Sequence, residues 1–378
     1  MACGAYIHIP FCKQKCYYCD FPSYGGVEKY IPAYVKALCT EMRHSAFAHS
    51  LLDTIYIGGG TPSILTPGQL ESILATVRNT FTVTNTAEVT LEVNPQSVNS
   101  SYYPALLAIG INRLSFGVQS FQDGELNRIG RTHTAQEAEQ SIRAAYAAGI
   151  SNISADLIYG LPGQQVRDFE KNVITANTLP LQHISAYGLQ LEEGTQFWQW
   201  QHQGKLTLPT DPENEAMYDL LCQRLQSAGF EHYEISNFAR PGYRSRHNMK
   251  YWQYDDYIGF GASAHSFVNG KRYAAVANIP RYIQAAGTID GTVVENIVIM
   301  PERAVEDYCF LALRTSDGIS YESFRNRFGY EITDIFGTVI DKLLQEKLLQ
   351  RTPAGVCLSN IGVKYGNYVF GEFIRPST

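Results

Sequence analysis

The sequence lacks the features that would assign it to a membrane, to secretion or to nucleic acid. No apolar run reaches the roughly 20 residues that a membrane-spanning helix needs. The N-terminus has neither the basic segment nor the long apolar segment of a signal peptide. Lys and Arg (30) are fewer than Asp and Glu (36), and a general nucleic-acid binder normally carries a basic face. These absences predict a soluble, cytoplasmic protein that does not bind nucleic acid.

Cysteine is sparse except in one short segment. Five of the eight cysteines are isolated, and their spacing predicts small buried hydrophobic side chains: Cys3, Cys39, Cys222, Cys309 and Cys357. The other three, Cys12, Cys16 and Cys19, fall within eight residues at the end of an apolar run that is typical of a first strand. A tight loop of this kind can place three thiolates around one compact group.

An iron–sulfur cluster is the group that this spacing favours, because cysteine thiolates are its usual ligands. A four-iron cluster held by three thiolates leaves one iron open to an external ligand, as in catalytic rather than structural metal sites. Two other structures, a zinc site and a disulfide loop, could use the same cysteine spacing. Zinc could use the three cysteines with a distant fourth ligand. A disulfide loop is disfavoured, because three cysteines leave one thiol over and no secretion signal is present.

Short apolar strands alternate with longer helices through the first 190 residues. The strands are expected near 6–9, 53–58, 88–93, 113–119, 153–159 and 183–189, and the helices near 28–46, 67–81, 102–109, 135–148 and 166–177. Such alternation indicates right-handed βαβ units and a parallel sheet. Six units are too few for a complete eight-stranded barrel, so the pattern predicts a partial (β/α)₆ barrel of TIM type.

The remainder of the chain is expected to form two further parts. Residues 190–300 are less regular, with a helix near 213–228 and a turn-rich, aromatic-rich stretch. After Pro301, helices near 302–313, 320–328 and 332–346 precede a strand pair around 353–355, which predicts a small winged-helix-like α+β domain. We therefore expect a barrel at 1–192, a barrel extension at 193–300 and a C-terminal domain at 301–378.

Polar residues stand at the ends of several of the expected strands. The run from Gly58 to Pro62 follows the second strand, and glycine lets a backbone approach a ligand closely. Glu92 and Gln119 end the third and fourth strands, and Asp156 interrupts an apolar one. A buried carboxylate without compensation costs several kcal/mol. Ligands of parallel sheets bind at the carboxyl ends of the strands, which favours one shared site over separate structural roles.

The C-x₃-C-x₂-C spacing, the preceding Tyr-Ile-His-Ile-Pro and the following aromatic residue resemble the radical S-adenosylmethionine (SAM) superfamily. The resemblance implies a [4Fe–4S] cluster on Cys12, Cys16 and Cys19, with SAM at the open iron. It also implies the roles of further residues toward SAM: Gly59, Gly60 and Thr61 near the methionine amino group, Glu92, Gln119 and Asp156 near the ribose or methionine, Arg131 on the carboxylate and Tyr6 near the adenine.

Within this superfamily, the chain resembles the group that contains oxygen-independent coproporphyrinogen III dehydrogenase and the haem chaperones of HemW type. The dehydrogenase carries a fourth cysteine two places after the third, where this chain has Phe21. The dehydrogenase also has a long N-terminal extension, whereas only five residues precede Tyr6 here. Both differences favour the chaperone.

A further motif has the same implication. His247-Asn248-Met-Lys-Tyr251-Trp252 resembles the H-N-x-x-Y-W motif of the haem chaperones. Histidine is a frequent axial ligand of haem iron, and flat aromatic side chains suit a porphyrin face. The resemblance therefore implies haem contact by His247, Tyr251 and Trp252, whereas a single histidine without it is more often structural. His8 is expected to pack or hydrogen-bond near the cluster.

The favoured interpretation is a haem chaperone that binds a [4Fe–4S] cluster, SAM and haem. By resemblance, it would pass haem to apoproteins of the respiratory chain, with peripheral membrane contact and a monomeric or dimeric state left open. One alternative is an enzyme of porphyrin biosynthesis, which cleaves SAM to decarboxylate coproporphyrinogen III oxidatively. The other is a binding module that holds zinc in place of the cluster.

Overall fold

The computed structural model describes residues 2–95, 98–288 and 291–375, and six parallel strands form the centre of the fold. Their order in the sheet is the same as their order along the chain. They are β1 (Cys3–Ile9), β4 (Leu51–Gly59), β5 (Thr82–Val93), β6 (Arg113–Gln119), β7 (Asn152–Tyr159) and β8 (His183–Gly188). Each pair is parallel. All six expected strands are therefore present, and the prediction of an α/β partial barrel is confirmed.

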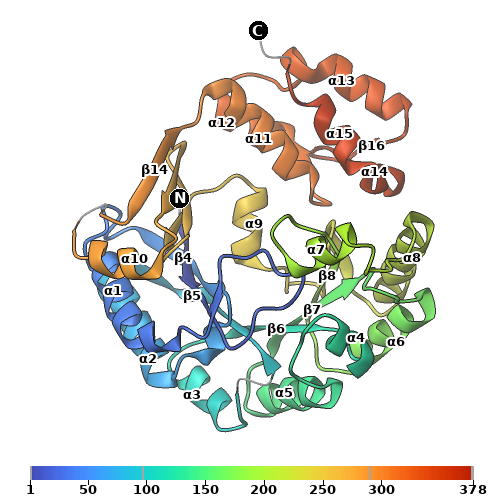
Figure 1. The fold of residues 1–378 in the computed structure, drawn as a ribbon. Coiled ribbons are helices and arrows are strands. Elements are labelled where there is room, and N and C mark those ends of the chain that lie inside the picture. Colours follow the sequence, from blue (N-terminus) through green and yellow to red (C-terminus); the bar gives the residue numbers. More distant parts are fainter. Residues whose placement is uncertain (1, 96–97, 289–290, 376–378) are drawn as a thin grey trace.

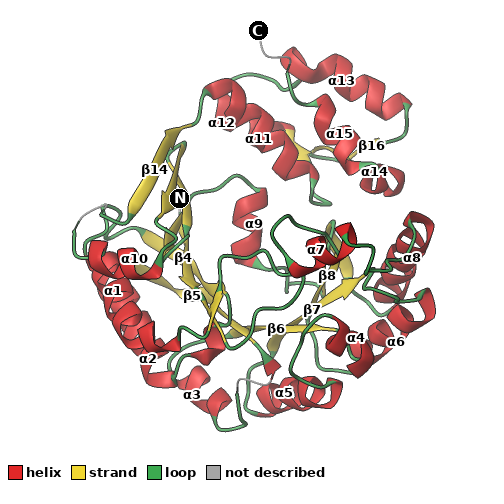
Figure 2. Cartoon of the chain, viewed as in Figure 1, coloured by secondary structure: helices red, strands yellow, loops and turns green. Residues whose placement is uncertain are grey.

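Helices cover the outer face of the curved sheet (Figures 1 and 2). They are α1 (Ile31–Arg43), α2 (Pro67–Thr80), α3 (Tyr102–Ala108), α4 (Asp123–Arg128), α5 (Ala135–Ala147) and α6 (Val166–Asn177), whereas the short helices η1 (Glu28–Tyr30) and η2 (Pro62–Ile64) belong to the connections between strand and helix. Two of them begin with a capping box, at Thr66 of α2 and at Thr134 of α5. The side-chain oxygen of a capping residue accepts from a backbone N–H that has no partner within the helix, which fixes where the helix begins.

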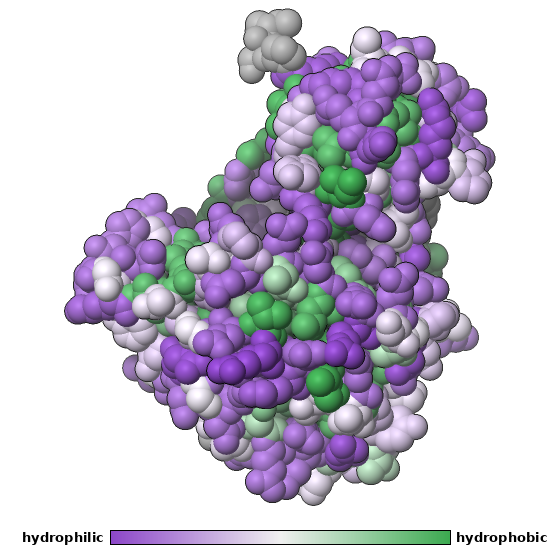
Figure 3. Space-filling model, turned by 90° about the vertical axis from the view of Figure 1, so that its right-hand side faces the viewer, coloured by the Kyte–Doolittle hydropathy of each residue, from purple (hydrophilic) through white to green (hydrophobic). Residues whose placement is uncertain are grey.

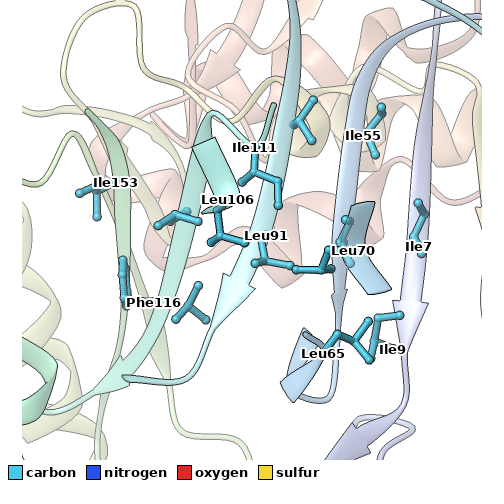
Figure 4. Close-up of a cluster of buried hydrophobic side chains, with 14 of the residues drawn as sticks. Ile7, Ile9, Ile55, Leu65, Leu70, Leu91, Leu106, Ile111, Phe116 and Ile153 are labelled. Carbon is cyan, nitrogen blue, oxygen red and sulfur yellow. The ribbon is translucent and has the colours of Figure 1, made fainter. Parts of the chain in front are cut away.

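The apolar core lies between the sheet and these helices. On β4, Ile55 and Ile57 are buried in this core and alternate with Thr54 and Tyr56. Figure 4 shows the same layer across neighbouring strands, with Leu91 and Phe116 beside the helical residues of α2 and α3. Because successive side chains of a strand point to opposite faces, the other face of each strand carries the polar residues that line the barrel interior.

The sheet continues beyond the six strands on both sides, which was not apparent from the sequence. Past β8 lie β10 (Asn237–Ala239) and β9 (Glu231–Glu234); past β1 lie β11 (Tyr257–Phe260), β12 (His265–Val268), β13 (Lys271–Ala275) and β14 (Val293–Val298). In the chain, α7 (Gln196–His202) and α8 (Asp211–Ser227) lie between β8 and β9, α9 (Arg246–Trp252) lies between β10 and β11, and α10 (Ile279–Ala285) lies between β13 and β14. Most of these strands have three to five residues, too few to establish an alternating pattern.

The C-terminal part forms a smaller α+β unit with its own apolar core. It contains α11 (Pro301–Leu313), β15 (Ile319–Ser320), α12 (Tyr321–Phe328), α13 (Thr333–Gln345), β16 (Leu349–Arg351), β17 (Gly355–Leu358), α14 (Asn360–Lys364) and α15 (Gly366–Glu372). The three expected helices and the strand pair are present. The boundaries at residues 192 and 300 stay a prediction.

The surface of one side of the molecule is mainly hydrophilic, with the apolar residues in small separate patches (Figure 3). Among the described residues, every helix falls short of the length and apolar character needed to span a membrane.

Candidate cofactor site at the mouth of the barrel

The cysteine loop follows β1 at the carboxyl end of the sheet. A short parallel pair, β2 (Phe11–Cys12) with β3 (Tyr24–Gly25), ties the two ends of the loop together. All three cysteines are free thiols, and all three line one cavity of about 150 Å³. Within the described ranges, no three His, Cys, Asp or Glu side chains gather as closely as a single metal ion would require.

The glycine run after β4 packs directly against this loop. The Gly60 N–H donates to the Ile9 carbonyl (2.9 Å), and the Thr61 N–H donates to the Phe11 carbonyl (2.8 Å). A Cβ atom at Gly60 would lie 2.7 Å from the Phe11 carbonyl oxygen and 3.0 Å from the Cys12 Sγ. The position therefore excludes any larger residue, and the backbone of the glycine run forms one wall of the cavity.

Glu92 is held at the end of β5 by two donors. The Gly59 N–H donates to one carboxylate oxygen (3.0 Å), and the Tyr56 hydroxyl donates to the other (2.8 Å). Burial, with a smaller contribution from the nearby Asp156, raises the pKa of Glu92 to about 7, although the Tyr56 hydrogen bond opposes the shift. The carboxylate is thus fixed in position and poised to accept hydrogen bonds from a ligand in the cavity.

Gln119, the last residue of β6, and Arg131, which follows α4, line the same cavity. The Arg131 guanidinium donates to the Gly117 carbonyl and to the Cys16 Sγ (3.6 Å), while its buried Nε has no partner. Gln119 has a φ of 67°, in the left-handed region that non-glycine residues rarely adopt, beside a register shift between β6 and β7. Such local strain and bulges often re-aim a side chain at a functional site.

Asp156 completes the set on β7, within hydrogen-bonding distance of the Ser115 hydroxyl (3.3 Å). Burial raises its pKa, and Arg113 is among the groups that oppose this shift. Arg113 was not singled out from the sequence. Its side chain is 2% exposed, and its Nε and Nη1 atoms have no partner. The sequence could have indicated it, because Arg113 begins the apolar strand Arg113–Gln119 and therefore lies on the same inward face as Ser115.

These contacts bring together all the residues predicted for the cluster and nearly all of those predicted for SAM. One cavity is lined by Cys12, Cys16, Cys19, Gly59, Gly60, Thr61, Glu92, Gln119, Arg131 and Asp156. Three thiols, a backbone cradle without Cβ atoms and a guanidinium with an unpaired N–H fit an iron–sulfur cluster and an amino-acid ligand. Tyr6 lies in an adjoining cavity with Gly59 and Glu92. As expected, His8 forms hydrogen bonds, with the Tyr6 hydroxyl (2.9 Å) and the Pro22 carbonyl (2.8 Å).

The residues of the H-N-x-x-Y-W motif lie on α9, which packs against β1 and β4 of the barrel and against α11 of the C-terminal part. His247 is 1% exposed, and both ring nitrogens are engaged, Nδ1 with the Thr54 hydroxyl (2.9 Å) and Nε2 with the Tyr251 hydroxyl (2.8 Å). Burial lowers its pKa to about 3, and Lys250 contributes. Trp252 packs edge-on against Tyr233 instead. Haem contact by His247, Tyr251 and Trp252 stays a prediction, and iron ligation by His247 would first require breaking a hydrogen bond.

The depressed pKa of His247 has a consequence for stability. In an unfolded chain, histidine has a pKa of about 6.5, so below this pH the unfolded state binds a proton that the folded state excludes. The stabilisation is complete above pH 6.5 and is lost as the pH falls toward 3. We expect this one group to lower the free energy of unfolding by about 2 kcal/mol between pH 7 and pH 5.

Urea unfolding of wild type and of His247→Gln at both pH values measures this contribution. Glutamine can keep polar contacts with Thr54 and Tyr251 but does not titrate, so the variant should lose about 2 kcal/mol less than wild type on acidification. Equal losses in the two proteins would show that His247 is already protonated in the folded state at pH 5.

The chain is similar in sequence to known protein families. Residues 6–173 match the family model of the Radical SAM superfamily, and residues 300–363 match that of the HemN C-terminal domain. The chain is 37% identical to the protein named Heme chaperone HemW of Lactococcus lactis, across 98% of this chain and 97% of that protein. The chain belongs to the HemW family. The family resemblance inferred from the cysteine loop and the H-N-x-x-Y-W motif is confirmed.

Further relatives agree with this assignment. The HemW protein of Bacillus subtilis is 35% identical across 98% of this chain and 99% of that protein. The structure of coproporphyrinogen III oxidase (HemN) from Escherichia coli has a TM-score of 0.85 over 98% of this chain and 90% of that one, at 21% identity. HemN therefore supports the fold of the HemW family. Because radical SAM domains use a [4Fe–4S] cluster and SAM, these two cofactors are confirmed at the level of the family.

Proposed function

We propose that this protein is a haem chaperone that binds haem as cargo and transfers it to acceptor proteins, with a radical SAM core as its cofactor domain. The observation that carries the proposal is the identity of 37% over 98% of the chain to a protein named Heme chaperone HemW. The absence of a fourth cysteine supports it, because Phe21 occupies that place in the cysteine loop. The proposal includes a cytoplasmic location, peripheral membrane contact and respiratory apoproteins as acceptors.

The residues that line the cavity at the barrel mouth would each bind a different part of the cluster or of SAM. Cys12, Cys16 and Cys19 would hold the cluster, which supplies an open iron and an electron to SAM when both are bound. The Gly59–Thr61 backbone would pack along the methionine moiety. Glu92, already fixed by two hydrogen bonds, would accept from the ligand, as would Asp156 and Gln119. The unpaired Nε of Arg131 suits a carboxylate.

The test is reconstitution under exclusion of oxygen, followed by separate titrations with haem and SAM. We expect a Soret band at one haem per chain and a brown protein that contains iron and sulfide. Incubation with coproporphyrinogen III, SAM and a reductant should yield no protoporphyrinogen IX. Turnover of coproporphyrinogen would overturn the proposal in favour of the enzyme of porphyrin biosynthesis, and colourless protein with zinc would favour the binding module.

The role of Arg131 gives a prediction with a matched control. Charge-assisted hydrogen bonds contribute about 1.5–3 kcal/mol, so Arg131→Met should weaken SAM binding by about 10- to 100-fold. Arg128→Met, on the exposed last turn of α4, should leave the affinity unchanged. Equilibrium dialysis of the cluster-loaded proteins measures both. An Arg131 variant that keeps its iron and also its SAM affinity would remove Arg131 from the ligand-binding residues.

A further inference from the structure

An aromatic groove adjoins the cofactor cavity on the side of β11. Two neighbouring cavities, of about 350 and 390 Å³, share Tyr251, Tyr257 and His265 along their walls. The first also reaches Phe21, Gly59 and Glu92 of the cofactor site, and the second reaches Phe267 and Arg272. We call this feature, defined by Tyr251, Tyr257, His265, Phe267 and Arg272, the β11–β13 groove. Its volume falls in the range of small-molecule sites.

The strand register places the residues of the groove on one face of the sheet. Tyr257 of β11 lies opposite Phe267 of β12, and Phe267 lies opposite Arg272 of β13. His265 is two residues before Phe267 and therefore shares its face. Tyr251 of α9 packs edge-on against Tyr257, with ring centroids 4.6 Å apart. The result is an aromatic cluster on one face of the sheet, with the His265 imidazole shared by both cavities and the Arg272 guanidinium in the second.

His265 differs from the other histidines near these cavities in having an unengaged ring. His8 and His247 use both ring nitrogens in hydrogen bonds. His265 is exposed, and within the described part of the chain its ring forms no hydrogen bond or ion pair. An imidazole without a hydrogen-bond partner that lines a cavity can bind iron without first breaking a hydrogen bond.

We propose that the β11–β13 groove binds the porphyrin cargo, with His265 as an axial ligand of the haem iron. This inference rests on the proposed function as a haem chaperone and adds the position of the cargo. Tyr251, Tyr257 and Phe267 supply the apolar faces that a macrocycle needs. The first of the two cavities also contains Tyr6, Gly59 and Glu92, which the proposed function assigns to SAM. The porphyrin would therefore occupy the second cavity, lined by Tyr257, Phe267 and Arg272, and would adjoin the SAM site at His265.

The polar end of the groove suits the propionates of haem. Arg272 is half-exposed and pairs with the buried Asp307 (2.8 Å), which Arg303 also contacts (3.0 Å). Arg303 is shared between Asp307 and Glu306 (3.4 Å), whereas Arg272 pairs with Asp307, and the exposed side of the Arg272 guanidinium can bind a further carboxylate. A ligand with apolar faces, an iron centre and carboxylates at one edge matches this order of groups.

The groove also gives the H-N-x-x-Y-W motif a role that agrees with the burial of His247. The His247 ring contacts the Tyr251 hydroxyl from the barrel side (2.8 Å), and the Thr54 hydroxyl holds the His247 ring in turn (2.9 Å). His247 is therefore a positioning residue for Tyr251, which forms the groove wall. Replacing His247 should loosen this wall without changing the axial ligand.

Haem titration of the full-length protein, monitored by the Soret band and by electron paramagnetic resonance of the ferric state, tests the inference. We expect His265→Ala to lower haem affinity by about 10-fold or more and to change the axial-ligand signature. Added imidazole should restore that signature. His202→Ala, which removes an exposed histidine of α7 outside the groove, should behave as wild type. His247→Ala should weaken binding with the axial-ligand signature retained.

The outcomes separate this inference from the proposed function. Wild-type protein without a Soret band would overturn both. Wild-type binding with an unchanged spectrum and affinity in His265→Ala would overturn the inference alone, as would loss of the axial signature in His247→Ala only. Because His265 is exposed, its variant should keep the wild-type melting temperature. As a second variant on the wall, Tyr257→Ala should weaken haem binding without altering the axial ligand.

Discussion

Replacing Cys16 by Ala should reduce the iron and sulfide of reconstituted protein to background and abolish the brown colour. A cubane cluster with only two protein thiolates loses one of its three protein ligands and leaves a second iron without a cysteine, in addition to the iron that is already open. Cys16 is partly exposed at the cavity wall, so its removal leaves no cavity in the apolar core. Iron and sulfide analysis under exclusion of oxygen measures the effect.

The matched control is Cys222→Ala, which removes a thiol of the same partial exposure from α8, outside the cofactor cavity. It should retain wild-type iron and sulfide. A Cys16→Ala protein with full metal content would contradict the assignment of the three cysteines as the cluster ligands. So would equal loss in both variants, since that outcome would indicate a general sensitivity to cysteine replacement.

Glu41→Ala should produce a large loss of stability, although Glu41 touches no proposed ligand. Its carboxylate accepts from the Gly261 N–H (2.9 Å), the Tyr282 hydroxyl (2.6 Å) and the Thr292 hydroxyl (2.6 Å). It thereby joins α1 to the turn after β11, to α10 and to the start of β14. Truncation leaves these donors without a partner, at a cost of about 3–5 kcal/mol in total.

Urea denaturation of wild type, Glu41→Ala and the control Glu71→Ala measures this cost. Glu71 is exposed on α2, and its replacement should change stability by less than about 0.5 kcal/mol. Similar small effects at both positions would show that water replaces the carboxylate at no cost, and that Glu41 does not anchor the sheet extension.

The barrel and its cysteine loop could be predicted from the sequence because their signals are local. Each strand of the barrel is long enough to show an apolar run, and each helix shows its own periodicity between clear turn residues. The three cysteines lie within eight positions, so their convergence depends on a single loop. The polar residues at the strand ends could be grouped as well, because parallel strands bring their carboxyl ends to one edge.

The extension of the sheet and the groove could not be predicted in this way. The strands β11 to β13 are four or five residues long, so no periodicity distinguishes them from turns. His247 was expected to contact haem, yet the structure buries it at Thr54 and leaves His265 open to a cavity.

The sequence by itself determined the strands and helices of the barrel, the main helices of the C-terminal part and the grouping of the three cysteines in one loop. Only the tertiary structure decided which of the remaining polar side chains are engaged and which are free. Glu41 looks like a surface residue of an amphipathic helix until Gly261, Tyr282 and Thr292, from distant parts of the chain, donate hydrogen bonds to it. The reason is physical: hydrogen bonding and burial depend on neighbours that the fold brings together from far along the chain, and local pattern carries no record of them.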